Sequence, residues 1–421
     1  MPSAAGTASG KLPVVVWVLS ACTFLMGTTE FVVAGLLPEM ADDLGVSVSQ
    51  AGLLITAFAI GMIVGGPAMA MATLRLPQRR TLILALILAL TVFALGHVVA
   101  ALSSSFTILL MARVVTALAT GAFWAIGFVI ATAAAGSGNS TRAVGVMMGG
   151  LTLANVIGVP IGSFAGQFTG WRGPFWALAV LSALAAAFIG RFIPTVGQRA
   201  EVSVRAELRA LRQGRLWLAL AAAALIMGGV LATYTYITPL LTDRSGIGQG
   251  AVPLVLIGFG AGSLGGTAAG GRMGERRPMA TAITAAAATA LTLFLLVPLS
   301  NSPVTAIALV FLMALMGFTV PPVLTSLAVR LAGDAPTLTS ALTTSAYNTG
   351  IAAGSAVAGL AMDSALGLTG PALVGAVFAA LSLLPLIALA VSGTPHRARI
   401  VAQRTRSTHV KDDAATPASQ R

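Results

Sequence analysis

Twelve stretches of mainly apolar residues follow one another along most of the chain, each about 20 residues long, the length a helix needs to cross a lipid bilayer. A water-facing surface needs roughly 25% charged residues, whereas this chain of 421 residues has 9%. The sequence therefore predicts an all-α integral membrane protein with twelve transmembrane helices. The predicted spans are 14–38, 50–72, 81–101, 106–132, 144–168, 174–193, 216–240, 252–271, 279–298, 304–329, 338–362 and 371–392.

The basic residues predict which ends of these spans face the cytoplasm. Of the 24 Lys and Arg residues, Arg172 and Arg244 fall in loops on one side and Arg113 lies within a span, which leaves 21 on the side that holds both termini. Cytoplasmic loops are enriched in Lys and Arg, so both termini are predicted to be cytoplasmic. The net charge of +12 then reflects membrane topology, and no nucleic-acid partner is expected.

The spans divide into two similar halves, which is typical of transporters built from a tandem repeat. Gly166 follows Asn155 by eleven residues in span 5, and Gly359 follows Asn348 by eleven residues in span 11. We therefore predict two pseudo-symmetric six-helix bundles. The predicted segments are a cytoplasmic N-terminus (1–13), a first bundle (14–193), a cytoplasmic linker with an amphipathic helix (194–215), a second bundle (216–392) and a disordered cytoplasmic tail (393–421).

Two ionisable residues lie well inside the spans, where charge is costly and commonly functional. At about 1.5 Å rise per residue, Glu30 lies about 6 Å and Arg113 about 9 Å outward of their span centres, so a direct or water-bridged pair is geometrically feasible. A purely structural ion pair is one interpretation. Because the second half has no charged counterpart to either residue, we favour a proton-coupling role, with Glu30 also contacting the substrate.

The other polar and aromatic residues inside the spans are candidates for a substrate cavity. Each could instead form an interhelical hydrogen bond or anchor a helix at the membrane interface. The candidates are Asn155, Asn348, Tyr234, Tyr236 and Tyr347, with Phe123 and Trp124 as an apolar wall. His97, near the outer end of span 3, is expected at the interface. The sequence contains no motif for a metal, for ATP or for hydrolysis, so no metal or cofactor is expected.

Small residues recur in span 5 and predict a face for close helix contact. They are Gly150, Gly158, Gly162 and Gly166, and Pro160 among them removes one helical hydrogen bond and permits a bend. Tight packing alone and a role in bending or gating are both consistent with this pattern.

These residues together resemble the major facilitator superfamily, and within it the twelve-span drug:proton antiporters of the bacterial chloramphenicol-resistance and arabinose-efflux type. The likeness covers 14–392 and is most specific in the stretch MGTTEF (26–31), which continues through GLLP (35–38) and ADDL (41–44). Arg113 matches the family's span 4 arginine, and the span 5 glycines match its antiporter motif. The loop after span 2 keeps Arg79 and Arg80, which the family uses in a cytoplasmic gate, but lacks the usual Asp.

The resemblance implies a proton-coupled exporter that works by alternating access on a small, mainly neutral, drug-like molecule, with chloramphenicol as the first candidate. Export of sugars or nucleosides is the alternative. The protein is then expected to be a monomer in the inner membrane of a bacterium, driven by the proton gradient. An integral-membrane enzyme or lipid-handling protein would need clustered catalytic polar groups, and a channel would need a ring of repeated polar residues; the sequence shows neither.

Overall fold

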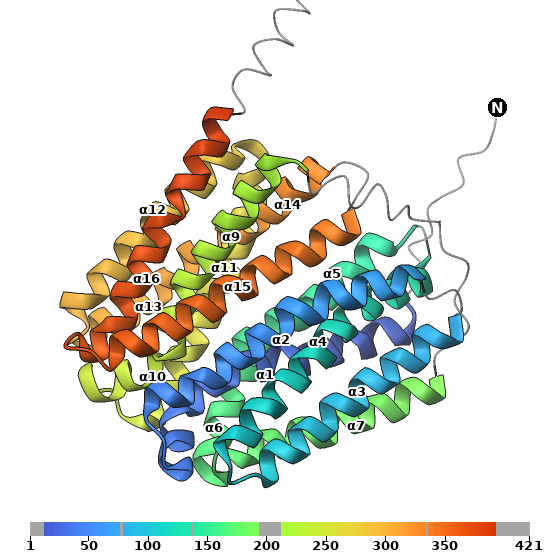
Figure 1. The fold of residues 1–421 in the computed structure, drawn as a ribbon, viewed down its shortest axis with the longest axis horizontal. Coiled ribbons are helices and arrows are strands. Elements are labelled where there is room, and N and C mark those ends of the chain that lie inside the picture. The colour runs from blue at the N-terminus through green and yellow to red at the C-terminus, as the bar shows by residue number, and fades with distance from the viewer. Residues whose placement is uncertain (1–11, 76–78, 137, 193–211, 333–335, 393–421) are drawn as a thin grey trace, which may run out of the picture.

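A computed structural model describes residues 12–75, 79–136, 138–192, 212–332 and 336–392 of the chain. These residues form helices joined by short turns (Figure 1). The predicted N-terminal segment, the tail and nearly all of the amphipathic linker helix lie outside the described residues. Helix α3 begins at Arg79, but the side chains of Arg79 and Arg80 are not among those described.

The helices of the first half correspond to the first six predicted spans. Span 5 is assembled from three consecutive pieces, α5, η1 and α6. The bounds are α1 Val14–Leu44, α2 Val48–Arg75, α3 Arg79–Leu102, α4 Phe106–Ala135, α5 Ser140–Leu153, η1 Ala154–Gly158, α6 Val159–Thr169 and α7 Arg172–Phe192.

The helices of the second half correspond to the last six spans, and spans 7, 10 and 12 are also built from several pieces. The bounds are α9 Gly214–Thr235, α10 Ile237–Pro239, η2 Leu240–Arg244, η3 Gln249–Ala251, α11 Val252–Arg276, α12 Pro278–Leu299, α13 Pro303–Gly317, α14 Val320–Ala332, α15 Pro336–Met362, η4 Gly367–Thr369 and α16 Gly370–Leu381.

Eleven helical segments within the described part of the chain are long and apolar enough to cross a membrane. The one predicted span not among these eleven is span 11, which is α15, a helix of 27 residues that packs along both α2 and α9. Its first half contains many Thr and Ser residues, which lower its hydropathy, and its position between other helices explains why it can be more polar than a lipid-facing span. The prediction of an all-helical membrane protein is confirmed.

The packing of the second half repeats that of the first with a shift of six spans. Helix α1 packs on α5 as α9 packs on α15; α2 packs on α4 as α11 packs on α13; and α3 packs on α7 as α12 packs on α16. These corresponding helix contacts in the two halves agree with the repeat that the sequence indicates.

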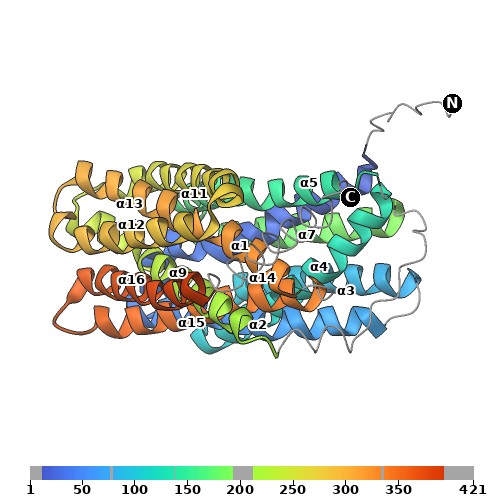
Figure 2. The ribbon, with the colours of Figure 1, turned by 90° about the horizontal axis from the view of Figure 1, so that it is seen from above.

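The two halves meet along α2 and α15 and at one end of the molecule, which we call the contact end. It carries the turn 45–47, the segment 240–251 and the turn 363–369. Here Thr238 donates to the Ala34 carbonyl at 2.8 Å and Gln167 donates to the Gln249 carbonyl at 2.8 Å. Away from this end the ribbons of the two halves diverge (Figure 1), and seen from above they form two groups (Figure 2). We call the diverging end the open end.

Four spans are interrupted: spans 5, 10 and 12 well within their length, the last at Ser382, and span 7 toward the contact end. Span 5 contains a π-helical turn, η1, just before Pro160; such turns are frequent at functional sites. Span 7 breaks at Tyr236, where the backbone leaves helical geometry (φ −109°, ψ 27°). Span 10 breaks between Gly317 and Val320, directly before Pro321. These interruptions place irregular backbone inside the protein, where neighbouring helices can satisfy it.

Candidate functional site

Glu30 lies in the middle of α1, and its side chain stays partly exposed although it is deep within the helical part of the protein. None of the described residues donates a hydrogen bond to it. The preceding residue, Thr29, is fully buried, and the following residue, Phe31, is partly exposed. Glu30 is therefore a carboxyl group inside the fold that keeps access to small molecules or ions.

Arg113 of α4 is almost completely buried behind Glu30, with 1% of its surface exposed. Its Nη1 donates to the Thr29 carbonyl oxygen at 2.9 Å, and its Nε donates to the Leu54 carbonyl oxygen at 3.2 Å. The guanidinium also lies over the Phe58 ring, 4.3 Å from its centroid. Nη2 is buried without a hydrogen-bond partner among the described residues. The arginine is held mainly by backbone carbonyls and an aromatic face.

Glu30 and Arg113 act on each other electrostatically but do not form a direct ion pair. In this part of the fold, the charge of Arg113 acts on Glu30 and the charge of Glu30 acts on Arg113. The ion pair found within 4 Å among the described residues joins Arg172 and Asp43 at the contact end instead. The arrangement thus keeps a fixed positive charge near Glu30 without neutralising it by contact.

His97 of α3 is not at the membrane interface, so that expectation is wrong. The residue is 1% exposed, and its imidazole ring packs against the rings of Phe93 and Phe175. Its Nε2 lies 2.6 Å from Thr29 Oγ1 and its Nδ1 lies 2.8 Å from the Phe93 carbonyl oxygen. Sequence position suggested an interface because His97 is five residues from the helix end; the rotation of α3, which turns it inward, could not be read from that spacing.

Aromatic residues from both halves gather at Phe31, the residue that follows Glu30 in α1. The Phe31 ring of α1 meets Tyr234 of α9 edge-on, with centroids 6.2 Å apart. Tyr234 stacks at a tilt on Phe259 of α11 at 4.2 Å, and Phe259 meets Phe318 edge-on at 5.9 Å. We call Phe31, Tyr234, Phe259 and Phe318 the aromatic cluster. Only Tyr234 was expected here; the others are single phenylalanines in apolar sequence, which carry no signal of their own.

Tyr236 lies at the break in span 7, and its hydroxyl reaches both halves. It is 3.3 Å from the Ser49 carbonyl oxygen of α2 and 3.2 Å from the Ser355 carbonyl oxygen of α15. Two glycines make room for it: a Cβ on Gly52 would lie 2.6 Å from Tyr236 Cζ, and a Cβ on Gly359 would lie 2.6 Å from the hydroxyl. Tyr236 is 2% exposed, so the structure places it in the seam between α2 and α15.

Polar side chains continue this seam along α2 and α15. Ser49 Oγ donates to Asp363, and the Thr56 and Ser355 hydroxyls are 2.7 Å apart. Ser345 donates to the Ile63 carbonyl oxygen at 2.9 Å. We call these contacts, together with Tyr236, the α2–α15 seam. They hold the two halves together from the contact end past the middle of α2.

The two predicted asparagines have different surroundings. Asn155 is partly exposed within η1, and its backbone packs closely on Gly260 of α11. Asn348 is 3% exposed; its Nδ2 donates to the Thr344 carbonyl oxygen at 3.0 Å, while its Oδ1 is buried and has no hydrogen-bond partner in the described part of the chain. Both lie on helices that contact the opposite half.

Tyr347 is partly exposed and is tied to span 10. Its hydroxyl lies 2.9 Å from Thr325 Oγ1 and donates to the Pro321 carbonyl oxygen at 3.0 Å. The bond to Pro321 satisfies a backbone group beside the break in span 10. Tyr347 therefore stiffens this part of the second half.

Phe123 does not form the cavity wall expected of it. It is fully buried in the core of the first half, in a cluster with Met26 and Met147. Trp124 is partly exposed and packs against Phe58 and Met62. The adjacent positions were alike in sequence, but a step of about 100° around a helix sends neighbouring side chains in different directions.

The span 5 glycines line the contact with α1. A Cβ added at Gly150, Gly158, Gly162 or Gly166 would collide with Ser20, Thr28, Val32 or Leu36, respectively. Both sets follow four-residue spacing, as expected of two helices that pack along small-residue faces. Pro160 is buried in the same region. Close packing therefore accounts for all four glycines.

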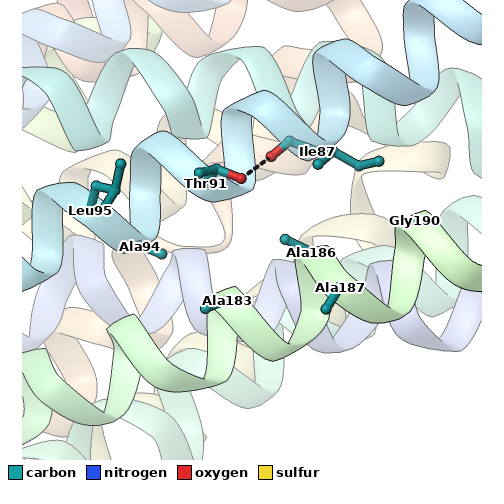
Figure 3. Close-up of a pocket in the computed structure, with 8 residues that line it drawn as sticks. All are labelled: Ile87, Thr91, Ala94, Leu95, Ala183, Ala186, Ala187 and Gly190. Atoms are coloured by element: carbon teal, nitrogen blue, oxygen red, sulfur yellow. Dashed lines mark hydrogen bonds between the residues drawn. The ribbon is translucent and has the colours of Figure 1, made fainter.

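The pocket found in the structure is separate from these residues. It lies between α3 and α7 (Figure 3). Its lining is Ile87, Thr91, Ala94, Leu95, Ala183, Ala186, Ala187 and Gly190. None of the predicted site residues belongs to it. Among the described residues there is also no group of His, Cys, Asp and Glu suited to a metal ion.

The sequence model of the protein family called Major Facilitator Superfamily matches residues 19–355 of this chain. A chloramphenicol resistance protein of Streptomyces lividans is 37% identical over 377 residues, covering 89% of this chain and 95% of that protein. The inner membrane transport protein YdhP of Escherichia coli K12 is 33% identical, covering 86% and 92%. A "Probable sugar efflux transporter" of Mannheimia succiniciproducens is 30% identical, covering 87% and 91%.

Solved structures share the fold. A bacterial homologue of the human lysosomal transporter Spinster, inward-facing and occupied, aligns with a TM-score of 0.74 at 17% identity, covering 90% of this chain and 98% of that one. The transporter FucP in its outward conformation aligns with a TM-score of 0.60 at 18% identity, covering 89% and 98%. With the family match and the relatives above, they show that this chain is a multi-pass membrane transporter of the Major Facilitator Superfamily.

Proposed function

We propose that this transporter exports a small, mainly neutral, drug-like molecule in exchange for protons, and that chloramphenicol is its first candidate substrate. The observation that carries the proposal is Glu30: a partly exposed carboxyl group, next in sequence to Phe31 of the aromatic cluster, with the buried charge of Arg113 acting on it. A carboxyl group of this kind can exchange a proton, and aromatic rings offer the flat apolar contacts that a nitrophenyl compound needs.

Relatives support this substrate class. The Streptomyces lividans relative is named a chloramphenicol resistance protein, and the match covers nearly all of both chains. In the proposed cycle, Glu30 takes up a proton when it faces the outside. Rocking of the two halves then exposes it to the cytoplasm, where the proton leaves as substrate binds.

The contact end is the predicted outer side, because α1 begins, and the described chain ends, toward the opposite, basic end (Figure 1). The arrangement described here then faces the cytoplasm. We further propose that the protein is a monomer in a bacterial inner membrane, with both termini in the cytoplasm. The E. coli relative named an inner membrane transport protein supports this location.

Substitution Glu30→Gln tests the coupling. We expect it to abolish chloramphenicol-dependent proton release from vesicles that contain the full-length protein, because an amide cannot take up the proton. The control is Asp42→Asn, which removes an exposed carboxylate from the same helix near the contact end and should leave coupling intact. Unchanged proton release in Glu30→Gln would refute the proposal.

Sugar export is the second candidate function, since one relative is named as a sugar efflux transporter. The partly exposed Tyr347 and Asn155 could contact a polyhydroxylated substrate. A resistance and accumulation profile across chloramphenicol, other antibiotics and non-metabolised sugars separates the two. Counterflow exchange of labelled substrate identifies a carrier, because a passive channel gives no such exchange.

A further inference from the structure

We propose that His97 is a positioning residue for proton coupling: it orients the Thr29 hydroxyl so that this hydroxyl helps to hold Arg113 beside Glu30. The inference rests on the proposed proton coupling. It assigns a role to two buried residues, on α3 and α1, that the charge pattern of the sequence does not reveal.

The hydrogen bonds of His97 have a defined direction. The Phe93 carbonyl can only accept, so Nδ1, at 2.8 Å, carries the hydrogen. In the neutral ring Nε2 then has a free lone pair and accepts from the Thr29 hydroxyl at 2.6 Å. With its hydrogen directed to His97, Thr29 Oγ1 presents a lone pair to Arg113 Nη1 at 3.3 Å. The chain of donors runs from Arg113 through Thr29 to His97 and ends at Phe93.

Thr29 behaves differently from its neighbours on α1. Thr23 and Thr28 donate to the carbonyl four residues earlier in the helix, at 2.9 and 2.8 Å, which is the usual choice of a buried helical threonine. Thr29 instead donates across to α3. His97 is therefore the group that diverts this hydroxyl from its own helix toward the arginine.

The surroundings of His97 favour a fixed, neutral ring. It is 1% exposed and contacts the Phe93 and Phe175 rings. Among the described residues, Arg113 is the charged group that acts on the His97 ring. Glu30 and Arg113 act on each other, and no further charged group of the described residues acts on these two. A second positive charge on His97 would face Arg113 across one hydroxyl without a carboxylate to balance it.

Holding Arg113 matters because its remaining contacts are few. Nη1 also donates to the Thr29 carbonyl oxygen at 2.9 Å, Nε donates to the Leu54 carbonyl oxygen, the guanidinium face covers Phe58, and Nη2 has no partner among the described residues. Since Thr29 immediately precedes Glu30, the Thr29 anchor sets the position of the positive charge relative to the carboxyl group.

Two pairs of variants test this role in full-length protein reconstituted in liposomes. Thr29→Val and His97→Leu each remove the hydrogen bond; Thr29→Ser and His97→Gln each keep a group that can make it. We expect the first two to move the pH midpoint of chloramphenicol-dependent proton release about half a unit or more toward alkaline pH, because Glu30 loses part of a fixed positive charge. Thr29→Ser and His97→Gln should stay near the wild-type midpoint.

The double variant Thr29→Val/His97→Leu should shift the midpoint no further than either single variant, because both remove the same interaction. Unshifted midpoints in the two single variants, or additive shifts in the double variant, would overturn the inference. If wild-type protein itself shows no drug-dependent proton release, the proposed function fails.

In that case the positioning role is decided by a readout that needs no substrate. Nitrogen-15 NMR of the histidine-labelled protein should show His97 with a protonated Nδ1 and a bare Nε2. The Nε2 signal should shift in Thr29→Val but not in Thr29→Ser. A protonated Nε2, or a signal that does not respond to Thr29→Val, would contradict the proposed direction of the hydrogen bonds.

Discussion

Substitution Tyr236→Phe removes one hydroxyl from the α2–α15 seam and should shift the transporter away from the form closed at the contact end. The hydroxyl lies between two backbone carbonyls of opposite halves, at 3.3 Å from Ser49 and 3.2 Å from Ser355. The phenyl ring still fits between Gly52 and Gly359, so packing is retained. The perturbation is thus confined to the hydrogen bonds of one hydroxyl, of which the one to Ser49 joins the two halves.

The expected magnitude follows from the geometry. A hydroxyl has one hydrogen, so the two carbonyls share the equivalent of one hydrogen bond. Side-chain hydrogen bonds between membrane helices contribute about 0.6 kcal/mol on average and up to about 1.7 kcal/mol, which corresponds to a shift of about 3-fold to about 18-fold in the equilibrium. Tyr236 and Ser355 belong to the same half, so only the contact with Ser49 is lost when the contact end opens, and the expected shift lies at the lower end of this range, about 3-fold.

The shift can be measured from distances between spin labels at Ser104 and Ser302, two exposed residues in turns of opposite halves at the contact end. The single native cysteine, Cys22, is buried and is replaced by Ser in all variants. Tyr347→Phe is the matched control, since its hydroxyl bonds only within the second half, to Thr325 and Pro321. A shift below 2-fold for Tyr236→Phe, or equal shifts in both variants, would refute the reasoning.

Two further predictions concern packing and substrate contact. Gly150→Ala should destabilise the protein by about 1–3 kcal/mol, because its Cβ would collide with the Ser20 backbone. The control is the adjacent Gly149→Ala, whose Cβ meets open space and which should be neutral or slightly stabilising. Equal melting temperatures of the two variants would contradict this prediction. Phe259→Ala should raise the KM for chloramphenicol about 2-fold to about 12-fold through loss of aromatic contacts. The control Phe168→Ala removes a ring that is 74% exposed, and an unchanged KM in Phe259→Ala would exclude the aromatic cluster from binding.

The membrane class, the positions of the spans and the repeat followed from the sequence alone. Transfer of an apolar stretch into lipid depends on the sum of its residues, which needs no tertiary information. For the same reason Glu30 and Arg113 were identifiable as unusual, since charge inside a span is costly wherever the helix packs. The span 5 glycines were likewise readable as a small face, because helical periodicity alone predicts it.

What surrounds each residue was decided by the tertiary structure. Helix rotation buries Phe123 and leaves Trp124 partly exposed, and it turns His97 toward Thr29 instead of the interface. Tyr236 lies in the seam at the break in span 7, and packing brings phenylalanines from distant spans together with Tyr234. In a chain this uniformly apolar, hydropathy determines that a segment enters the membrane but hardly constrains its rotation. Rotation is set by close packing and by the few hydrogen bonds between helices, which exist only once the helices have assembled.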